Sequence, residues 1–282
     1  MCAFKLMEPS LPPGLYIVAT PIGNLSDLSP RAAATLRGAD HILAEDKRVT
    51  AKLLAHAGAK APMTVYHDHS SDEDRQRTLD MLATRSVALV SDAGTPLISD
   101  PGFKLVRAAR AAGHRVVTIP GPCAAIAALT VAGLPTDRFL FAGFLPARAK
   151  ARRDAIAELG AIHASLVFYE SGPRLGDSLA DLADGLGGRD GAVVREISKL
   201  HEECVTGALA ELAQRYAQAP PRGEIVIVVG PPPQREASAG ELDAALFESL
   251  ARLSPSRAAA EVADRLGVPR KRAYARALEL SR

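Results

Sequence analysis

The chain has 282 residues, which at about 150 residues per domain predicts roughly two domains. Apolar residues make up 48% of it and charged residues 23%, proportions that exclude collagen-like, disordered and coiled-coil proteins. A formal net charge of only +2 does not by itself indicate a nucleic-acid or membrane partner, so any basic surface must be local.

Cysteine usage and the lengths of the apolar runs indicate where in the cell the protein is found. Cys2, Cys123 and Cys204 are far apart and odd in number, which indicates neither a disulfide framework nor a paired zinc site. Residues 1–13 contain no long apolar core, so we expect no signal peptide. The longest nearly apolar stretch, residues 123–134, is too short to span a bilayer. We therefore expect a cytoplasmic protein without a membrane partner.

The first half of the chain alternates short apolar runs with helical stretches. Strands are predicted over residues 15–19, 41–44, 87–90 and 116–119, and helices over residues 31–37, 50–56, 72–83 and 102–112. Apolar runs of this length between polar helices indicate strands buried on both faces. The pattern predicts an α/β domain with a mainly parallel sheet, ending in the loop around Pro135.

A second block repeats this alternation, and a third is helical. The second block has predicted strands over residues 139–142, 166–169, 193–197 and 225–229, and helices over residues 152–159, 174–182 and 208–217. After a linker at residues 234–240, helical patterns cover residues 241–253, 256–266 and 270–280. The turn Gly267-Val268-Pro269 before a basic helix is typical of a helix-turn-helix, although a plain packing module has the same pattern. The predicted divisions are residues 1–14 (an extension), 15–134, 135–233 and 234–282.

Three loops that follow predicted strands are rich in glycine and proline. They cover residues 19–29, 91–102 and 120–125. Loops at the carboxyl ends of strands face the crevice in which open α/β sheets bind ligands. Gly94 and Gly102 let the backbone approach a ligand closely, while Pro96 and Pro101 stiffen the second loop. The loops therefore predict a preformed small-molecule site.

Several common motifs are missing from the sequence. It contains neither the Gly-x-Gly-x-x-Gly turn of dinucleotide-binding proteins nor the phosphate loop that ends in Gly-Lys-Ser/Thr. The one tight histidine cluster, His67-Asp68-His69, is more typical of polar surface than of a metal site, so we expect no metal.

Together these loops resemble the ribosomal RNA small subunit methyltransferase I family of the tetrapyrrole methylase superfamily. The resemblance covers about residues 15–230, and the tail also fits. It is carried by Ala19-Thr20-Pro21-Ile22-Gly23-Asn24-Leu25, Ala44-Glu45-Asp46-Lys47-Arg48, residues 91–102, Pro120-Gly121-Pro122-Cys123-Ala124-Ala125, Gly143-Phe144-Leu145-Pro146 and Phe168-Tyr169-Glu170-Ser171. The resemblance implies two α/β domains with a cofactor cleft between them, followed by a small helix-turn-helix-like module.

The resemblance also implies the activity. Members of this family use S-adenosylmethionine to methylate the ribose 2′-hydroxyl of a cytidine in 16S ribosomal RNA, and they commonly form homodimers. The implied cofactor-binding residues are Asp92, Gly94, Thr95, Pro96, Ile98, Ser99, Asp100, Pro122, Cys123, Ala124, Phe168 and Tyr169. Two positions depart from the family pattern: Lys47 replaces a usual threonine, and Gly172-Pro173-Arg174 stands where a His-Arg pair is common.

Methyl transfer to a ribose hydroxyl needs alignment and a nearby proton acceptor or orienting group. The candidate catalytic residues are Glu170, Asp46 and Lys199, with Glu45 and Glu196 as further carboxylates. Glu170 could equally cap the following helix, and Lys199 could be a solvated cation at the end of a strand. The alternative catalytic roles of Lys199 are to lower the pKa of the hydroxyl or to hold a phosphate.

Bound RNA requires local positive charge. Arg148, Lys150, Arg152 and Arg153 are predicted near a helix N-terminus, where the helix dipole favours acidic residues, and this mismatch favours an RNA contact over a solvated helix start. The other candidate RNA-binding residues are Pro21, Asn24, Lys47, Arg48, Arg174, Arg270, Lys271 and Arg272.

Two alternatives remain open at this point. A precorrin-type tetrapyrrole methyltransferase would use the same cleft, but a small substrate needs neither the basic run nor the tail. A ligand-sensing regulator that binds nucleic acid through the C-terminal helices would bind duplex DNA and transfer no methyl group.

Overall fold

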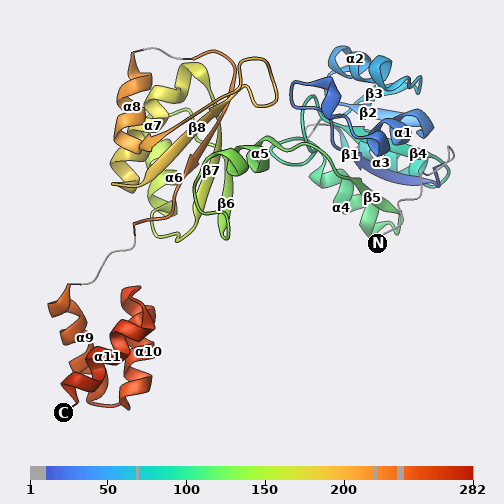
Figure 1. Ribbon diagram of the computed structural model, residues 1–282. Coiled ribbons are helices and arrows are strands. Elements are labelled where there is room, and N and C mark those ends of the chain that lie inside the picture. The colour runs from blue at the N-terminus through green and yellow to red at the C-terminus, as the bar shows by residue number, and fades with distance from the viewer. Residues whose placement is uncertain (1–10, 68–69, 219–220, 234–237, 282) are drawn as a thin grey trace. The chain divides into compact units, whose positions relative to one another are not determined.

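A computed structural model describes residues 11–67, 70–218, 221–233 and 238–281 (Figure 1). Cys2, Asp68, His69, most of the predicted N-terminal extension and residues 234–237 of the predicted linker lie outside these residues. Within the described part of the chain, no helix combines the length and the apolar character that crossing a membrane requires.

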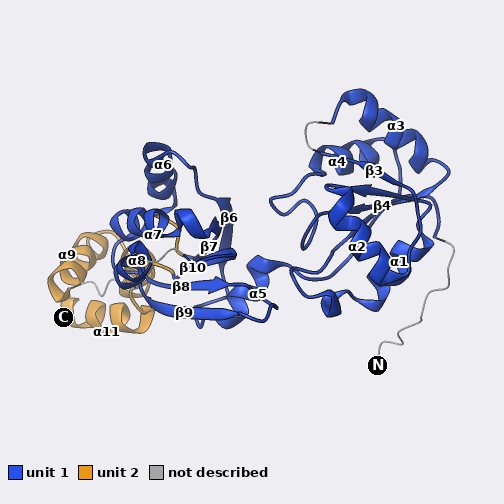
Figure 2. Ribbon diagram, turned by 90° about the horizontal axis from the view of Figure 1, so that it is seen from above, with its two compact units in different colours: residues 1–160, 164–230 blue, residues 161–163, 231–282 orange. Residues whose placement is uncertain are grey.

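The chain forms two compact units (Figure 2). Unit 1 comprises Met1–Gly160 and Ala164–Gly230, and unit 2 comprises Ala161–His163 and Pro231–Arg282. Unit 1 contains two separate five-stranded sheets. The division at residues 134 and 135 stays a prediction.

The first sheet of unit 1 is entirely parallel and has the strand order β3-β2-β4-β1-β5. Its strands are β1 (Gly14–Val18), β2 (His41–Ala44), β3 (Met63–Val65), β4 (Ser86–Val90) and β5 (Val116–Ile119). All residues of β1 and β4 are buried, as the apolar runs predict. The short strand β3 was not predicted.

Helices cover both faces of this sheet. They are α1 (Pro30–Gly38), α2 (Lys47–Ala57), α3 (Asp72–Leu82) and α4 (Phe103–Ala111), while the short 3-10 helix η1 (Leu25–Asp27) lies in the loop before α1 and buries no residue. Apolar side chains of α1 and α2 pack on one face, and those of α3 and α4 pack on the other. Local signals set the helix starts: Ser29 accepts a hydrogen bond from the backbone nitrogen of Ala32 at 3.1 Å, with Pro30 at the first helical position.

The second sheet is mixed, with the order β6-β7-β10-β8-β9. Its strands are β6 (Phe139–Phe144), β7 (Ser165–Ser171), β8 (Asp190–Arg195), β9 (Glu203–Ala208) and β10 (Glu224–Val229). Only the β6–β7 pair is parallel, and β9 was not predicted. Helices α7 (Gly172–Leu186) and α8 (Leu209–Ala217) pack against one face with α6 (Ala149–Leu159) beside α7, while α5 (Ala124–Val131) packs against the other (Figure 1).

Unit 2 consists of three helices with a core of their own. They are α9 (Ala239–Leu250), α10 (Pro255–Leu266) and α11 (Arg270–Leu280), close to the three predicted helical patterns. Leu246, Val262 and Ala273 are fully buried between them. Gly267 ends α10 in a left-handed conformation, φ 64°, which turns the chain into α11.

Candidate active site

The three predicted loops follow neighbouring strands β1, β4 and β5 and are tied to one another. Thr20 and Gly94 exchange two backbone hydrogen bonds, of 2.8 and 3.1 Å, which join the first loop to the second. The Thr95 hydroxyl donates to the Pro122 carbonyl at 2.9 Å, which joins the second loop to the third. Hydrogen bonds therefore join the three loops into one continuous surface, which is called the wall below.

The second loop has a backbone shape that few residues adopt. Gly94 has φ 84°, and a Cβ placed there would lie 3.3 Å from Ile22 Cγ2. Leu97 and Ser99 have φ values of 75° and 60° although they carry side chains. Such conformations cost free energy and persist only where the surroundings enforce them, which is typical of ligand-binding loops.

These loops border a cavity of about 360 Å³ in unit 1, here called the main cavity. Of the predicted cofactor-binding residues, the structure places Asp92, Gly94, Thr95, Ile98, Ser99, Asp100, Ala124 and Tyr169 along it. Sequence reasoning missed other lining residues, among them Ile22, Ala93, Phe144, Ser171, Ile197, Gly223, Ile225 and Val226. Pro96, Pro122 and Cys123 belong to the same loops but do not line it.

Phe168 and Tyr169 were both predicted to bind the cofactor, but their side chains lie on opposite faces of β7. Phe168 is fully buried and does not line the main cavity, because side chains alternate between the two faces of a strand. Tyr169 lines the cavity, and its hydroxyl accepts a hydrogen bond from the Ala125 backbone nitrogen at 3.3 Å. The Phe144 ring stands edge-on to Tyr169, with centroids 5.6 Å apart. Burial raises the pKa of Tyr169, so this hydroxyl remains protonated.

Acidic side chains line the main cavity. The pKa of Asp100 is raised to about 6, mainly by burial and also by the nearby charges of Glu45 and Asp92, while a hydrogen bond with Ser91 acts to lower it. Among the described residues that line this cavity there is no lysine or arginine. The cavity is therefore suited to a ligand that carries positive charge.

Asp46, a predicted catalytic residue, caps a helix. Its carboxylate accepts a hydrogen bond of 2.7 Å from the Arg48 backbone nitrogen and forms an ion pair with the Arg48 guanidinium. These hydrogen bonds lower the pKa of Asp46 to about 2. Its backbone nitrogen donates to Asp92 at 3.0 Å, whereas its side chain does not line the main cavity. The neighbouring carboxylate that does line it is Glu45.

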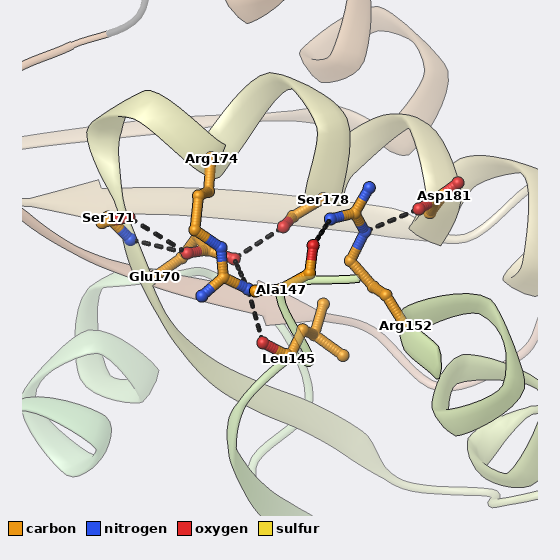
Figure 3. A network of polar contacts seen from close by, with 8 residues as sticks. All are labelled: Leu145, Ala147, Arg152, Glu170, Ser171, Arg174, Ser178 and Asp181. Atoms are coloured by element: carbon orange, nitrogen blue, oxygen red, sulfur yellow. Dashed lines mark hydrogen bonds and ion pairs between the residues drawn. The ribbon is translucent and has the colours of Figure 1, made fainter. Parts of the chain in front are cut away.

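Glu170 lies in a buried polar network (Figure 3). It borders the main cavity, but its carboxylate accepts hydrogen bonds from the Ser171 backbone nitrogen at 2.8 Å and the Ser178 hydroxyl at 2.6 Å. Arg174 lies 3.4 Å from the same carboxylate and also donates to the Leu145 carbonyl. This geometry matches the alternative role considered for Glu170, that of fixing the first turns of the following helix.

The basic run at the start of α6 is divided between surface and interior. Arg148, Lys150 and Arg153 are exposed. The Arg152 side chain is only 7% exposed and pairs with Asp181 of α7 at 2.6 Å (Figure 3). The prediction that Arg152 contacts RNA is therefore wrong for this arrangement, because a phosphate could reach the guanidinium only if the buried pair opened.

Lys199 lies in the loop between β8 and β9, where two carboxylates hold it. Its Nζ is 2.8 Å from Glu224 and 3.0 Å from Glu196. Burial acts to lower the pKa of Lys199, but the hydrogen bonds and charges of these carboxylates outweigh it and raise the pKa. Lys199 therefore remains a cation that can hold a phosphate or an oxyanion, and it cannot accept a proton.

The remaining predicted RNA-binding residues differ in exposure. Asn24, Lys47 and Arg48 are exposed at one end of the first sheet of unit 1, and Arg270, Lys271 and Arg272 are exposed on α11 of unit 2. Pro21 is buried and Arg174 belongs to the network around Glu170.

Family comparisons agree with the architecture. Residues 14–213 match the family described as Tetrapyrrole (Corrin/Porphyrin) Methylases, and residues 236–281 match the RsmI C-terminal HTH domain. The solved structure of a diphthine synthase superposes with a TM-score of 0.61 at 15% identity, covering 77% of this chain and 89% of that one. The structure of uroporphyrin-III C-methyltransferase from Thermus thermophilus complexed with S-adenosyl homocysteine gives 0.53 at 22% identity, covering 77% and 97%. At these identities the likeness shows the fold.

Curated relatives are much closer in sequence. The chain is 53% identical over 270 residues to ribosomal RNA small subunit methyltransferase I of Erythrobacter litoralis, covering 96% of both chains. It is 46% identical over 273 residues to the protein of that name from Mesorhizobium japonicum, covering 96% of this chain and 93% of the other. These matches confirm the resemblance predicted from the loops. The chain therefore belongs to the ribosomal RNA small subunit methyltransferase I family and has the tetrapyrrole methylase fold.

Proposed function

We propose that the chain transfers a methyl group from S-adenosylmethionine to the ribose 2′-hydroxyl of a cytidine in 16S RNA of the small ribosomal subunit. The observation that carries this proposal is the nearly full-length similarity to relatives named as small subunit rRNA methyltransferases. The chain is accordingly an enzyme that depends on S-adenosylmethionine and acts on ribosomal RNA.

The charge of the main cavity fits this cofactor. S-adenosylmethionine carries a sulfonium cation and a positively charged amino group. Glu45, Asp92 and Asp100 line the cavity, and an ionised carboxylate favours a nearby cation. A volume of about 360 Å³ lies within the range of small-molecule sites. These residues would hold the cofactor within the wall that the three loops form.

The loops can supply most of the catalysis by positioning. The bound cofactor supplies an electrophilic methyl group, and the ribose hydroxyl must approach it in line. Loops joined by hydrogen bonds hold the two substrates in this geometry without reordering. Holding two reactants in line accounts for a large share of the rate of a two-substrate reaction. Glu45 and Asp100 line the main cavity and would accept the hydroxyl proton. Lys199 is held as a cation for a phosphate or the developing alkoxide.

Exposed basic residues would bind the RNA backbone. In unit 1 these are Lys47, Arg48, Arg148, Lys150 and Arg153, and in unit 2 Arg270, Lys271 and Arg272. Each phosphate contact of this kind releases counterions, so affinity should fall steeply with salt. A small tetrapyrrole substrate would not need these residues.

A homodimer is supported by an apolar surface on α5 and β6. Ile126 and Val131 of α5 are 47% and 45% exposed, and Phe139 of β6 is 44% exposed. Apart from Thr130, α5 consists of apolar residues distributed around the helix, which is typical of a helix covered on all sides. A second copy that presents the same surface would cover it. The test is the solution mass measured by light scattering: a dimer supports the assignment, and a monomer at micromolar concentration contradicts it.

The test of the activity is methylation of purified small ribosomal subunits with labelled S-adenosylmethionine. We expect nucleoside mass spectrometry to find one 2′-O-methylated cytidine in subunits from cells that lack the gene, after incubation with the protein. Parallel incubation with a precorrin-type tetrapyrrole should give no transfer. Transfer to the tetrapyrrole and none to the subunits would refute the proposal.

A further inference from the structure

A second cavity of about 290 Å³ lies beside the main cavity in unit 1. The two share Ile22, Asp92, Ala93 and Glu224 in their walls, so a ligand in one lies next to a ligand in the other. Its remaining walls come from the first loop, Ser91 of the second loop, the first two turns of α2 and Lys199 of the β8–β9 loop. Pro21 and Asn24, which were predicted to bind RNA, both line it.

Thr50 of α2 is one of the residues that line this second cavity, and its buried hydroxyl has no partner in the described part of the structure. The residue is 1% exposed, and its Oγ1 makes no hydrogen bond within the described part of the structure. Two other helical threonines behave differently: Thr35 donates to the Arg31 carbonyl at 2.8 Å, and Thr78 donates to the Asp74 carbonyl at 2.9 Å. A buried hydroxyl without a partner costs free energy, and valine would fill the same space without that cost.

The surroundings of Thr50 specify the kind of ligand. Ile22, Leu25 and Leu53 make part of the cavity wall apolar, which suits a flat ring. Lys52 and Lys199 line the cavity together with the carboxylates of Asp92 and Glu224, and the exposed Lys47 and Arg48 begin the same helix α2. A ligand that places a flat ring with a polar edge in the cavity and keeps its phosphates outside, near the exposed cations, is a nucleotide. A cavity of about 290 Å³ is small even for a drug-sized ligand, which favours a single nucleoside over a tetrapyrrole.

We propose that the second cavity receives the acceptor nucleoside, extruded from the RNA, and that the Thr50 hydroxyl hydrogen-bonds the polar edge of its base. This inference rests on the proposed function. The base would occupy the part of the cavity near Thr50, and the ribose would lie toward the walls shared with the main cavity. Extrusion places a target nucleotide in a closed pocket that reads its edge. Thr50 is thus a substrate-binding residue outside the loops that line the main cavity.

The test compares Thr50→Val with Thr50→Ser and with Thr35→Val as a matched control. Thr50→Val removes the unpartnered hydroxyl at nearly constant volume, so we expect kcat/KM for small subunits to fall roughly five- to tenfold. The melting temperature should stay equal or rise, and the affinity for S-adenosylmethionine measured by calorimetry should not change. Thr50→Ser should retain most activity. Thr35→Val removes a buried hydroxyl that is already bonded, and its kcat/KM should match wild type.

The outcomes separate this inference from the proposed function. A wild-type protein that binds the cofactor but leaves the subunits unmethylated overturns the proposed function, and the inference falls with it. Wild-type activity together with an equally active Thr50→Val variant overturns the inference alone. Should Thr50→Val fold poorly, Thr50→Ala, which removes atoms without adding any, provides a second variant without the hydroxyl and with the same expected loss.

Discussion

Replacing Asp100 by asparagine should stabilise the protein and weaken its binding of the cofactor. The pKa of Asp100 is raised from 3.8 to about 6, mainly because the carboxyl is buried. At about 1.36 kcal/mol per pKa unit, this shift corresponds to a penalty of about 3 kcal/mol for holding the charged form in the folded state. Asp100 is only partly buried, so solvent screening reduces the expected gain to about 1–2 kcal/mol.

The sign of this effect depends on pH. The folded state keeps the Asp100 proton up to about pH 6, whereas the unfolded chain loses it near 3.8. Stability is therefore lost as the pH rises between these values, and the penalty is complete above the folded pKa. The asparagine side chain of the variant cannot ionise, so the advantage of Asp100→Asn should be full at about pH 7.5, about half as large at about pH 5, and absent well below about pH 4.

The assay is thermal unfolding of wild type and Asp100→Asn across this pH range, followed through the transition of unit 1. A gain of about 1–2 kcal/mol corresponds to a rise in melting temperature of about 3–6 °C for a unit of this size. Calorimetry should show weaker binding of S-adenosylmethionine by the variant, and wild-type affinity should increase as the pH rises through about 6. A stability difference that does not change with pH would refute the reasoning.

Three other predictions follow from contacts in the structure. Glu170→Ala leaves its arginine partner without a buried counter-charge, so urea denaturation should show a loss of about 3 kcal/mol; a variant that is inactive but fully stable would instead indicate a catalytic role. Arg153→Ala should reduce the salt dependence of RNA binding without affecting stability, whereas Arg152→Ala should lower the melting temperature; the reverse pattern contradicts the assignment. Deletion of residues 238–282 should weaken RNA binding and leave cofactor affinity intact, since unit 2 has its own core; equal loss of both would contradict this division.

The sequence predicted those parts of the fold that local signals determine. Serine and proline at helix starts and fully apolar runs in buried strands act within a few residues, and the elements they predict in the first sheet were confirmed. Strands β3 and β9 were missed because they are short or partly exposed and carry no apolar run. The three loops were recognised because glycine and proline concentrate there, and they do come together in the structure.

The roles of single side chains were harder to predict because they depend on distant partners. Asp181 lies 29 residues after Arg152, so nothing near the basic run indicates that one of its cations is buried. The choice between Phe168 and Tyr169 depends on which face of β7 meets the cavity, which a run of apolar residues does not specify. Thr50 was overlooked because a threonine in a helix has no distinctive signal until its hydrogen bonds are known.

The paired backbone hydrogen bonds between Thr20 and Gly94 have a thermodynamic consequence. Thr20 lines the second cavity and Gly94 the main one, so a ligand that removes the residual motion of one of these joined loops also removes motion from the other. Methyl donor and RNA should then bind cooperatively, and this cooperativity must be reciprocal: whatever factor the donor adds to the affinity for RNA, RNA adds to the affinity for the donor.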